Sequence, residues 1–227
     1  MQQFQFIDLV FLGIVVLLLV GRLRSVLGTR SERGEKSSPA KSKIVDISEY
    51  RTLKNEEEDG FREDFDENMT EKDLEIMAAV RSIAKKYPDF NLSDFLHKAA
   101  RAFEYIAQAF AAGKKEDLQP LLSRDIYKRF EKVIDNRKAR GETAEFSLIG
   151  FKNVKLVGAG EIGNMAEMTV EFETEQTNIV KNAAGDIILG DPTYIETVTD
   201  VWTLRKEMNA ESPVWVLAAT HHKPAEA

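Results

Sequence analysis

The pattern of apolar and polar residues changes character several times along the chain. A nearly unbroken apolar run comes first, and a polar stretch follows it. Apolar residues then recur at helical spacing, and after Gly141 they alternate with polar ones at a period of two. Helix faces repeat about every 3.6 residues and strand faces every two. The order predicts a membrane segment, a linker and an α+β domain whose helices precede an antiparallel sheet.

The first apolar run predicts a transmembrane helix. Asp8 is its one charge, and continued to Leu23 the run has the roughly 20 residues that span a bilayer core. Arginines follow the run, and no small-residue cleavage site does, which argues against a cleaved signal; an interfacial helix is the other alternative. The anchor candidates are Phe4, Leu9, Phe11, Val15, Leu18, Arg22 and Arg24.

The charges beside this run predict its orientation. Positive flanks remain on the cytoplasmic side, so we expect a single-pass protein with its N-terminus outside and its C-terminal domain in the cytoplasm. The predicted divisions are an anchor with a basic flank, a flexible acidic linker, an α+β domain and a tail, at residues 1–27, 28–68, 69–222 and 223–227.

The polar stretch predicts a tether, because it lacks the apolar residues needed for a core. Its acidic end carries Phe61 and Phe65 between carboxylates. That end is either solvated linker or a segment that docks on a basic groove of a partner. The apolar patch at 44–50 is either tether or a short strand or docking peptide.

Three amphipathic helices are predicted after Thr70. Thr70, either Asn91 or Ser93, and Ser123 are their N-cap candidates, while Pro88, Gly113 and Gly141 mark where they end. A short helical segment is expected at 116–122. The middle helix has the strongest apolar face and many alanines on its other faces, so we expect it to be central.

Strands are predicted where the period becomes two. They are expected near residues 146–157, 166–173, 194–204 and 214–219, with turn signals at Gly158-Ala159-Gly160, Gly185-Asp186 and Ser212-Pro213. These segments should form an antiparallel sheet that curls around the helices. The fold class is therefore α+β.

Composition narrows the choice of function. The formal net charge of −7 argues against general binding to DNA, which requires a basic surface. With no cysteine, the chain has neither disulfides nor thiol chemistry. It also lacks a glycine-rich phosphate loop, a metal-ligand cluster and a nucleophile motif, so we expect no cofactor, no metal and no catalytic residue.

A pocket between helices and sheet is a further hypothesis. It would suit an acyl chain or an apolar peptide side chain, although core packing also explains most of the aromatic residues concerned. The lining candidates are Phe103, Phe110, Tyr127, Phe130, Trp202 and Trp215.

Asp200 is the candidate buried polar residue. It shares strand parity with Val198, Trp202 and Leu204, so a regular strand would turn its carboxylate to the apolar side. It then either serves as a general base or, as we prefer, accepts structural hydrogen bonds from the backbone or Tyr127, unless a bulge turns it outward. No catalytic partner is evident, because His97 lies off its helix's apolar face and His221-His222 lie in a polar tail.

Positive charge gathers near the end of the first helix. Arg81, Lys85 and Lys86 complement the helix dipole there, and they are also our candidates for contact with anionic lipid.

Several segments, taken in order, resemble a known family. They are the run from Asp94 to Gly113, then Leu118 to Ser123 with Tyr127 and Phe130, Gly190-Asp191-Pro192, Val198 to Leu204, and Trp215-Val216-Leu217. Together they are similar to the Tim-forty-four-like (Tim44-like) domain, the C-terminal domain of the mitochondrial inner-membrane import-motor docking subunit. That domain also occurs in bacterial membrane-anchored proteins.

The resemblance implies a cone-like fold of the nuclear-transport-factor-two-like group and a noncatalytic role at a membrane. The anchor, the short tether and the missing presequence depart from the mitochondrial pattern, so we expect a bacterial inner-membrane protein and consider chaperone recruitment doubtful. The leading hypothesis is a tethered binding or adaptor module in protein translocation or membrane-protein assembly. Its partners would be lipid and a membrane or translocation-related protein.

Two alternatives remain open. A mitochondrial ribosomal protein shares this domain type, which implies a ribosome-to-membrane adaptor that would use a basic face. The candidate cations are Lys114, Lys115, Arg124, Lys128, Arg129, Lys132, Arg137, Lys138 and Arg140. Against this alternative stands the usual explanation of such cations as the solvated face of a helix. The minor alternative is a small-molecule enzyme centred on Asp200.

Overall fold

The computed structural model describes residues 70–208, 210, 212 and 214–223. Helices come first, as α3 (Glu71–Lys86), α4 (Leu92–Ala111), α5 (Lys115–Leu118), the 3-10 turn η2 (Gln119–Leu121) and α6 (Arg124–Ala139). Strands follow, as β1 (Thr143–Ile162), β2 (Met165–Lys181), β3 (Ile187–Leu189), β4 (Glu196–Glu207) and β5 (Val216–Lys223). This confirms the predicted α+β class, with helices packed on an antiparallel sheet.

The helices begin at the residues whose side chains can accept hydrogen bonds from free backbone N–H groups. Thr70 and Asp73 form a reciprocal capping box at α3. Asn91 caps α4 through the backbone N–H of Asp94, and Ser123 caps α6. Asn91, rather than Ser93, is therefore the N-cap of the second helix.

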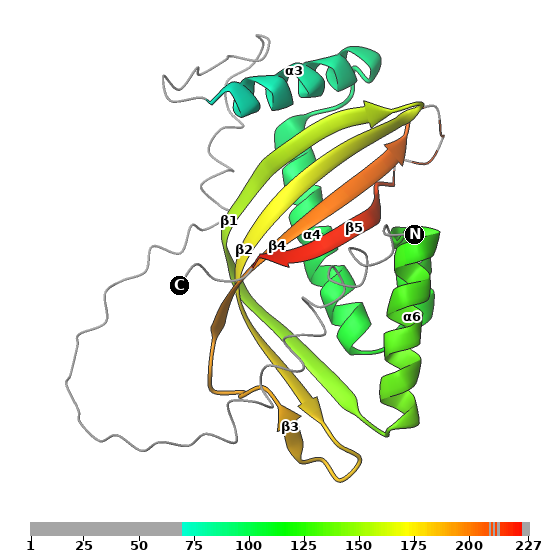
Figure 1. Cartoon of the computed structure of the whole chain (residues 1–227), viewed down its shortest axis with the longest axis vertical. Coiled ribbons are helices and arrows are strands. Elements are labelled where there is room, and N and C mark those ends of the chain that lie inside the picture. Colours follow the sequence, from blue (N-terminus) through cyan, green and yellow to red (C-terminus); the bar gives the residue numbers. More distant parts are fainter. Residues whose placement is uncertain (1–69, 209, 211, 213, 224–227) are drawn as a thin grey trace, which may run out of the picture.

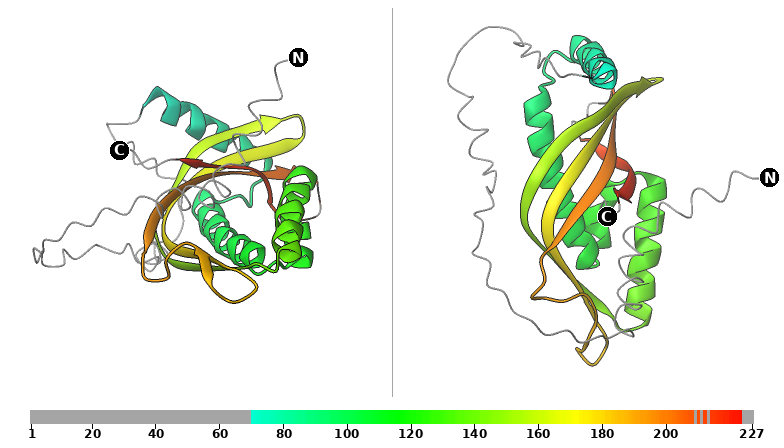
Figure 2. Two further views of the ribbon diagram at one scale, coloured as in Figure 1. Left: turned by 60° about the horizontal axis from the view of Figure 1, so that its bottom comes forward. Right: turned by 60° about the vertical axis from the view of Figure 1, so that its left-hand side comes forward.

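The sheet has the order β1-β2-β4-β5, and β3 pairs with the far end of β2. β1 and β2 form a long hairpin with three register shifts along its length. Register shifts of this kind bend and twist a strand, and the sheet in Figures 1 and 2 curls around α4. α3 lies across one end of the hairpin, and β3 lies at the opposite end of the molecule (Figure 1).

The core lies between α4 and the concave face of the sheet. Phe103 from α4 packs against Phe172 of β2 and Trp202 of β4, with ring centroids 4.8 and 4.7 Å apart. All three side chains are almost completely buried. The predicted central place of this helix is confirmed.

Two boundaries differ from the sequence-based expectation. Gly158-Ala159-Gly160 does not form a turn but continues β1, because a register shift between Leu156 and Gly158 absorbs the irregularity. The last strand runs on through His221 and His222, which pair with β4 and do not belong to a polar tail.

The predicted anchor and linker lie outside the described residues. None of the helices within 70–223 that the structure describes is long and apolar enough to cross a membrane. The likeness to nuclear-transport-factor-two-like cones stays a prediction.

Candidate functional site

A cavity of about 120 Å³ opens between α4, α6 and the end of the sheet that carries β3. β1, β2, β3, β4 and β5 all contribute to its wall, and most of that wall is apolar. The volume is close to that of engineered apolar cavities of about 150 Å³ that bind benzene. It is therefore sized for one side chain or ring, not for a whole acyl chain.

Four of the six predicted aromatic residues line this cavity: Phe103, Phe110, Phe130 and Trp202. Phe110 and Phe130 form one wall with ring centroids 4.5 Å apart. Tyr127 and Trp215 do not line this cavity. Tyr127 packs against the general core, and Trp215, which immediately precedes β5, packs edge-on against Phe95 of α4 at 4.8 Å.

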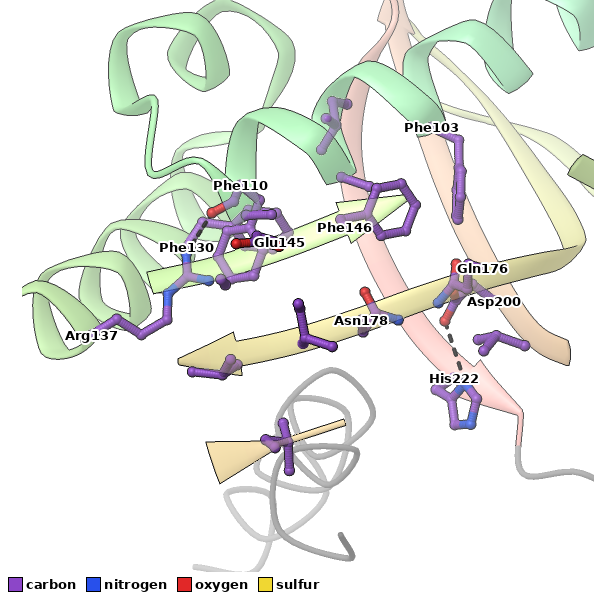
Figure 3. Close-up of a pocket in the computed structure, with 18 of the residues that line it drawn as sticks. Phe103, Phe110, Phe130, Arg137, Glu145, Phe146, Gln176, Asn178, Asp200 and His222 are labelled. Atoms are coloured by element: carbon purple, nitrogen blue, oxygen red, sulfur yellow. Dashed lines mark hydrogen bonds and ion pairs between the residues drawn. The ribbon is translucent and has the colours of Figure 1, made fainter. Parts of the chain in front are cut away.

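Asp200 faces the cavity, as its strand parity predicts, and is only 9% exposed. Its partner is His222, which lies opposite it in the β4–β5 register with Nδ1 3.4 Å from Asp200 Oδ1 (Figure 3). The hydrogen bond to Asp200 raises the pKa of His222, and partial burial opposes that rise. The sequence pattern did not indicate this imidazole neighbour of Asp200.

His221 and His222 face opposite sides of the sheet, because successive residues of a strand alternate between its two faces. His221 is exposed, while His222 turns into the cavity wall. The missed signal was the length of β5, since a strand that ended at residue 219 would leave both histidines outside the sheet.

Arg137 also lines the cavity, although the sequence indicates only that it belongs to a basic helix face. Its side chain is 7% exposed and donates a hydrogen bond to the carbonyl of Phe110 near the end of α4. Its guanidinium carbon also lies 4.8 Å from the centroid of the Phe110 ring. Figure 3 places Arg137 at one end of the lining and the Asp200–His222 pair at the other.

The predicted lipid-contact cations on α3 are not all unpaired. Lys86 forms an ion pair with Glu161 of β1, and Ser82 donates to the same carboxylate at 2.9 Å. These contacts lower the pKa of Glu161. Lys85 is exposed at the helix end.

The basic face proposed for ribosome docking is also partly neutralised. Lys115 lies 3.0 Å from Asp135 and 3.5 Å from Glu131, and Arg140 makes two hydrogen bonds to Glu142. With Arg137 buried, fewer cations remain for a phosphate surface than the sequence suggests. Among the described residues there is no group of three or more side chains placed to hold a metal ion.

The family model described as the Tim44-like domain matches residues 76–222. The chain belongs to the Tim44-like domain family. The match runs from Ile76 within α3 to His222 within β5, so the cavity lies entirely within it.

The Tim44-like segment is similar to several curated proteins. The mitochondrial import inner membrane translocase subunit TIM44 of Mus musculus is 24% identical over 144 residues, which cover 61% of this chain and 31% of that protein. TIM44-1 of Arabidopsis thaliana is 20% identical over 64% of this chain and 32% of its own length. The chain thus spans about a third of the length of the curated relatives it matches.

Among solved structures, one similar chain is the intermembrane space region of the chloroplast protein ARC6. It matches with a TM-score of 0.42 at 13% identity, over 60% of this chain and 98% of that one.

Proposed function

We propose that this Tim44-like protein is a noncatalytic binding module, held at an inner membrane by residues 1–27. In this role it supports protein translocation or membrane-protein assembly by binding a partner or client. Its relatives are named as import inner membrane translocase subunits, and these names support a role in protein translocation. The tether would raise the local concentration of the domain near membrane partners.

The observation that carries this proposal is the apolar cavity within the family domain. It has room for one benzene-sized group, and its wall is built mainly from phenyl rings and aliphatic side chains. Burying such a group removes apolar surface from water, which favours binding by about 25 cal/mol per Å². An exposed apolar side chain of a client segment fits this description.

Site-specific photocrosslinking in native membranes tests the proposal. A photoreactive phenylalanine analogue at Ala107, on the cavity wall, should crosslink to translocation or assembly components. The same analogue at Tyr105, which is 49% exposed on another face of α4, is the matched control. Equal products from both positions, or no protein products from Ala107, would reject the cavity as the binding site.

The membrane part of the proposal is tested by the same experiment on a chain without residues 1–27. Adducts at Ala107 should fall when the anchor is removed, because the domain would no longer be concentrated at the membrane. Undiminished adducts would show that tethering does not contribute.

Catalysis is the competing function, and the Asp200–His222 pair favours it, since acid–base chemistry uses such pairs. An activity screen of small substrates with wild type and Asp200→Asn decides between the two. Turnover that Asp200→Asn abolishes with the fold intact would replace the binding proposal. Crosslinking that survives in Asp200→Asn would support it.

A further inference from the structure

The charged residues of the cavity wall differ in whether they have a counter-charge. Glu145 forms an ion pair with Lys181, and Asp200 lies beside His222. Within the part of the chain that the structure describes, no carboxylate lies within ion-pair distance of Arg137. Glu142, which acts on the Arg137 pKa from farther away, is bound by Arg140 through hydrogen bonds of 2.7 and 2.6 Å.

An uncompensated buried cation is costly. Burial lowers the pKa of Arg137, but a guanidinium stays charged in proteins, so the group cannot avoid the cost by losing its proton. The Phe110 carbonyl accepts from one of its nitrogens, while a guanidinium carries five N–H donors in a planar fork. That fork matches the two oxygens of a carboxylate.

We propose that Arg137 anchors an anionic ligand group, and that the cavity binds a carboxylate attached to a benzene-sized apolar group. This inference rests on the proposed function and names the chemistry of the bound group. The apolar part would occupy the space between Phe110, Phe130 and the sheet, with the carboxylate on Arg137 (Figure 3). One cation matches the single charge of a carboxylate.

Two sources supply this chemistry. One is the last residue of a polypeptide that ends in an apolar or aromatic side chain, because its free carboxylate is joined to that side chain through one carbon. The other is a free small acid of the same size. A long fatty acid exceeds the cavity volume of about 120 Å³, so most of its chain would lie outside the cavity.

An alternative explanation for the buried position of Arg137 is its capping contact with the Phe110 carbonyl. A cation at a helix C-terminus complements the helix dipole and binds free carbonyls without any ligand. Under this alternative, the cavity would bind an acid and its uncharged amide equally well. A comparison of their affinities therefore distinguishes the two explanations.

The first experiment compares ligands on the full chain in detergent micelles. The chain has two tryptophans, so Trp215→Phe leaves Trp202, on the cavity wall, as the sole fluorescent reporter. The probes are 3-phenylpropionate and 3-phenylpropanamide, together with a short peptide ending in Phe as its free acid and as its C-terminal amide. We expect each acid to bind about 10-fold or more tightly than its amide, as a charged hydrogen bond predicts.

The peptide pair identifies the source. Tight binding of the free-acid peptide would assign the site to polypeptide C-termini, whereas binding of 3-phenylpropionate without the peptide would assign it to a free acid. Equal binding of acids and amides would overturn the role of Arg137 while leaving the cavity as a binding site. No binding of any probe would reject both the inference and the cavity-binding function.

The second experiment changes the protein. Arg137→Gln should remove the preference for acids, and Lys138→Gln, which deletes an exposed cation at the next position of the same helix, should retain it. Circular dichroism would establish that both variants are folded. A preference for acids that survives in folded Arg137→Gln would overturn the proposal, and the comparison of ligands on wild type stands even if that variant does not fold.

Discussion

Asp200 and His222 meet because the β4–β5 register places them directly opposite each other. The carboxylate is largely buried, and the imidazole is its cationic partner when protonated. A buried carboxylate is costly unless it is paired or hydrogen-bonded. The pair is therefore a stabilising element of the cavity wall, and its strength depends on pH.

This dependence can be measured. The pKa of His222 is raised in the folded state, so its contribution is complete below the ordinary histidine pKa of about 6.5 and is lost as pH rises through the raised value. We expect wild type to exceed His222→Gln in unfolding free energy by about 1 kcal/mol near pH 6, and by less near pH 8.5. Urea unfolding at the two pH values gives the difference.

His221→Gln is the control, because His221 is exposed on the other side of the same strand. Its difference from wild type should not change over this range. A constant difference for His222→Gln as well would mean that the pair is not formed in solution.

Trp202 is buried in the aromatic cluster with Phe103. Its indole nitrogen is buried and has no hydrogen-bond partner among the described residues. An unsatisfied buried donor costs about 1–3 kcal/mol, which Trp202→Phe would recover while losing packing volume. We therefore expect Trp202→Phe to change the unfolding free energy by no more than about 1 kcal/mol.

The unfolding free energies are measured by chemical denaturation, and Phe103→Ala is the reference substitution. Phe103 is 2% exposed and touches the same aromatic cluster, so its truncation should cost about 3–5 kcal/mol. A cost of that size for Trp202→Phe would indicate that the indole N–H is satisfied in solution.

At the scale of elements, β3 covers one side of the cavity. Leu189 lines the cavity, and Gly190 follows it with a φ of +79°. A Cβ on Gly190 would lie 1.9 Å from the backbone oxygen of Asn178. This close approach of two backbones holds the end of β3 against β2 and explains why a glycine is required.

Gly190→Ala should therefore release β3. We expect a loss of about 1–3 kcal/mol from the forced contact in addition to the cost of the left-handed conformation. Hydrogen–deuterium exchange over residues 177–190 should accelerate. Gly163→Ala is the control, since its φ is +61° but no atom lies within 4 Å of the added carbon. Equal effects of the two substitutions would contradict the close-approach explanation.

At the scale of the whole molecule, the proposed anchor at residues 1–27 leads to a prediction about which side of the membrane the cavity faces. Arginines after the first apolar run favour a cytoplasmic domain. In bacterial spheroplasts, protease added outside should leave the domain intact until the membrane is permeabilised. Cleavage of the domain in sealed spheroplasts would show the reverse orientation.

Much of the fold could be predicted from the sequence, because helix caps and periodicity are local properties. Thr70, Asn91 and Ser123 cap the helices. The wrong expectations concerned strand length and register. The Gly158-Ala159-Gly160 segment has turn composition, yet pairing with β2 keeps it extended. Trp215 has a large aromatic side chain of the kind that lines pockets, but it packs against Phe95 instead.

The sequence by itself determined the helix-then-strand order, the α+β class, the inward parity of Asp200 and the family resemblance. All of these depend on residues close together in the chain or on their order along it. Tertiary structure alone decided that His222 lies beside Asp200 and that the Arg137 side chain lines an apolar cavity, not an exposed basic helix face. Those contacts depend on strand register and helix packing, which join distant segments and leave no local periodic signal.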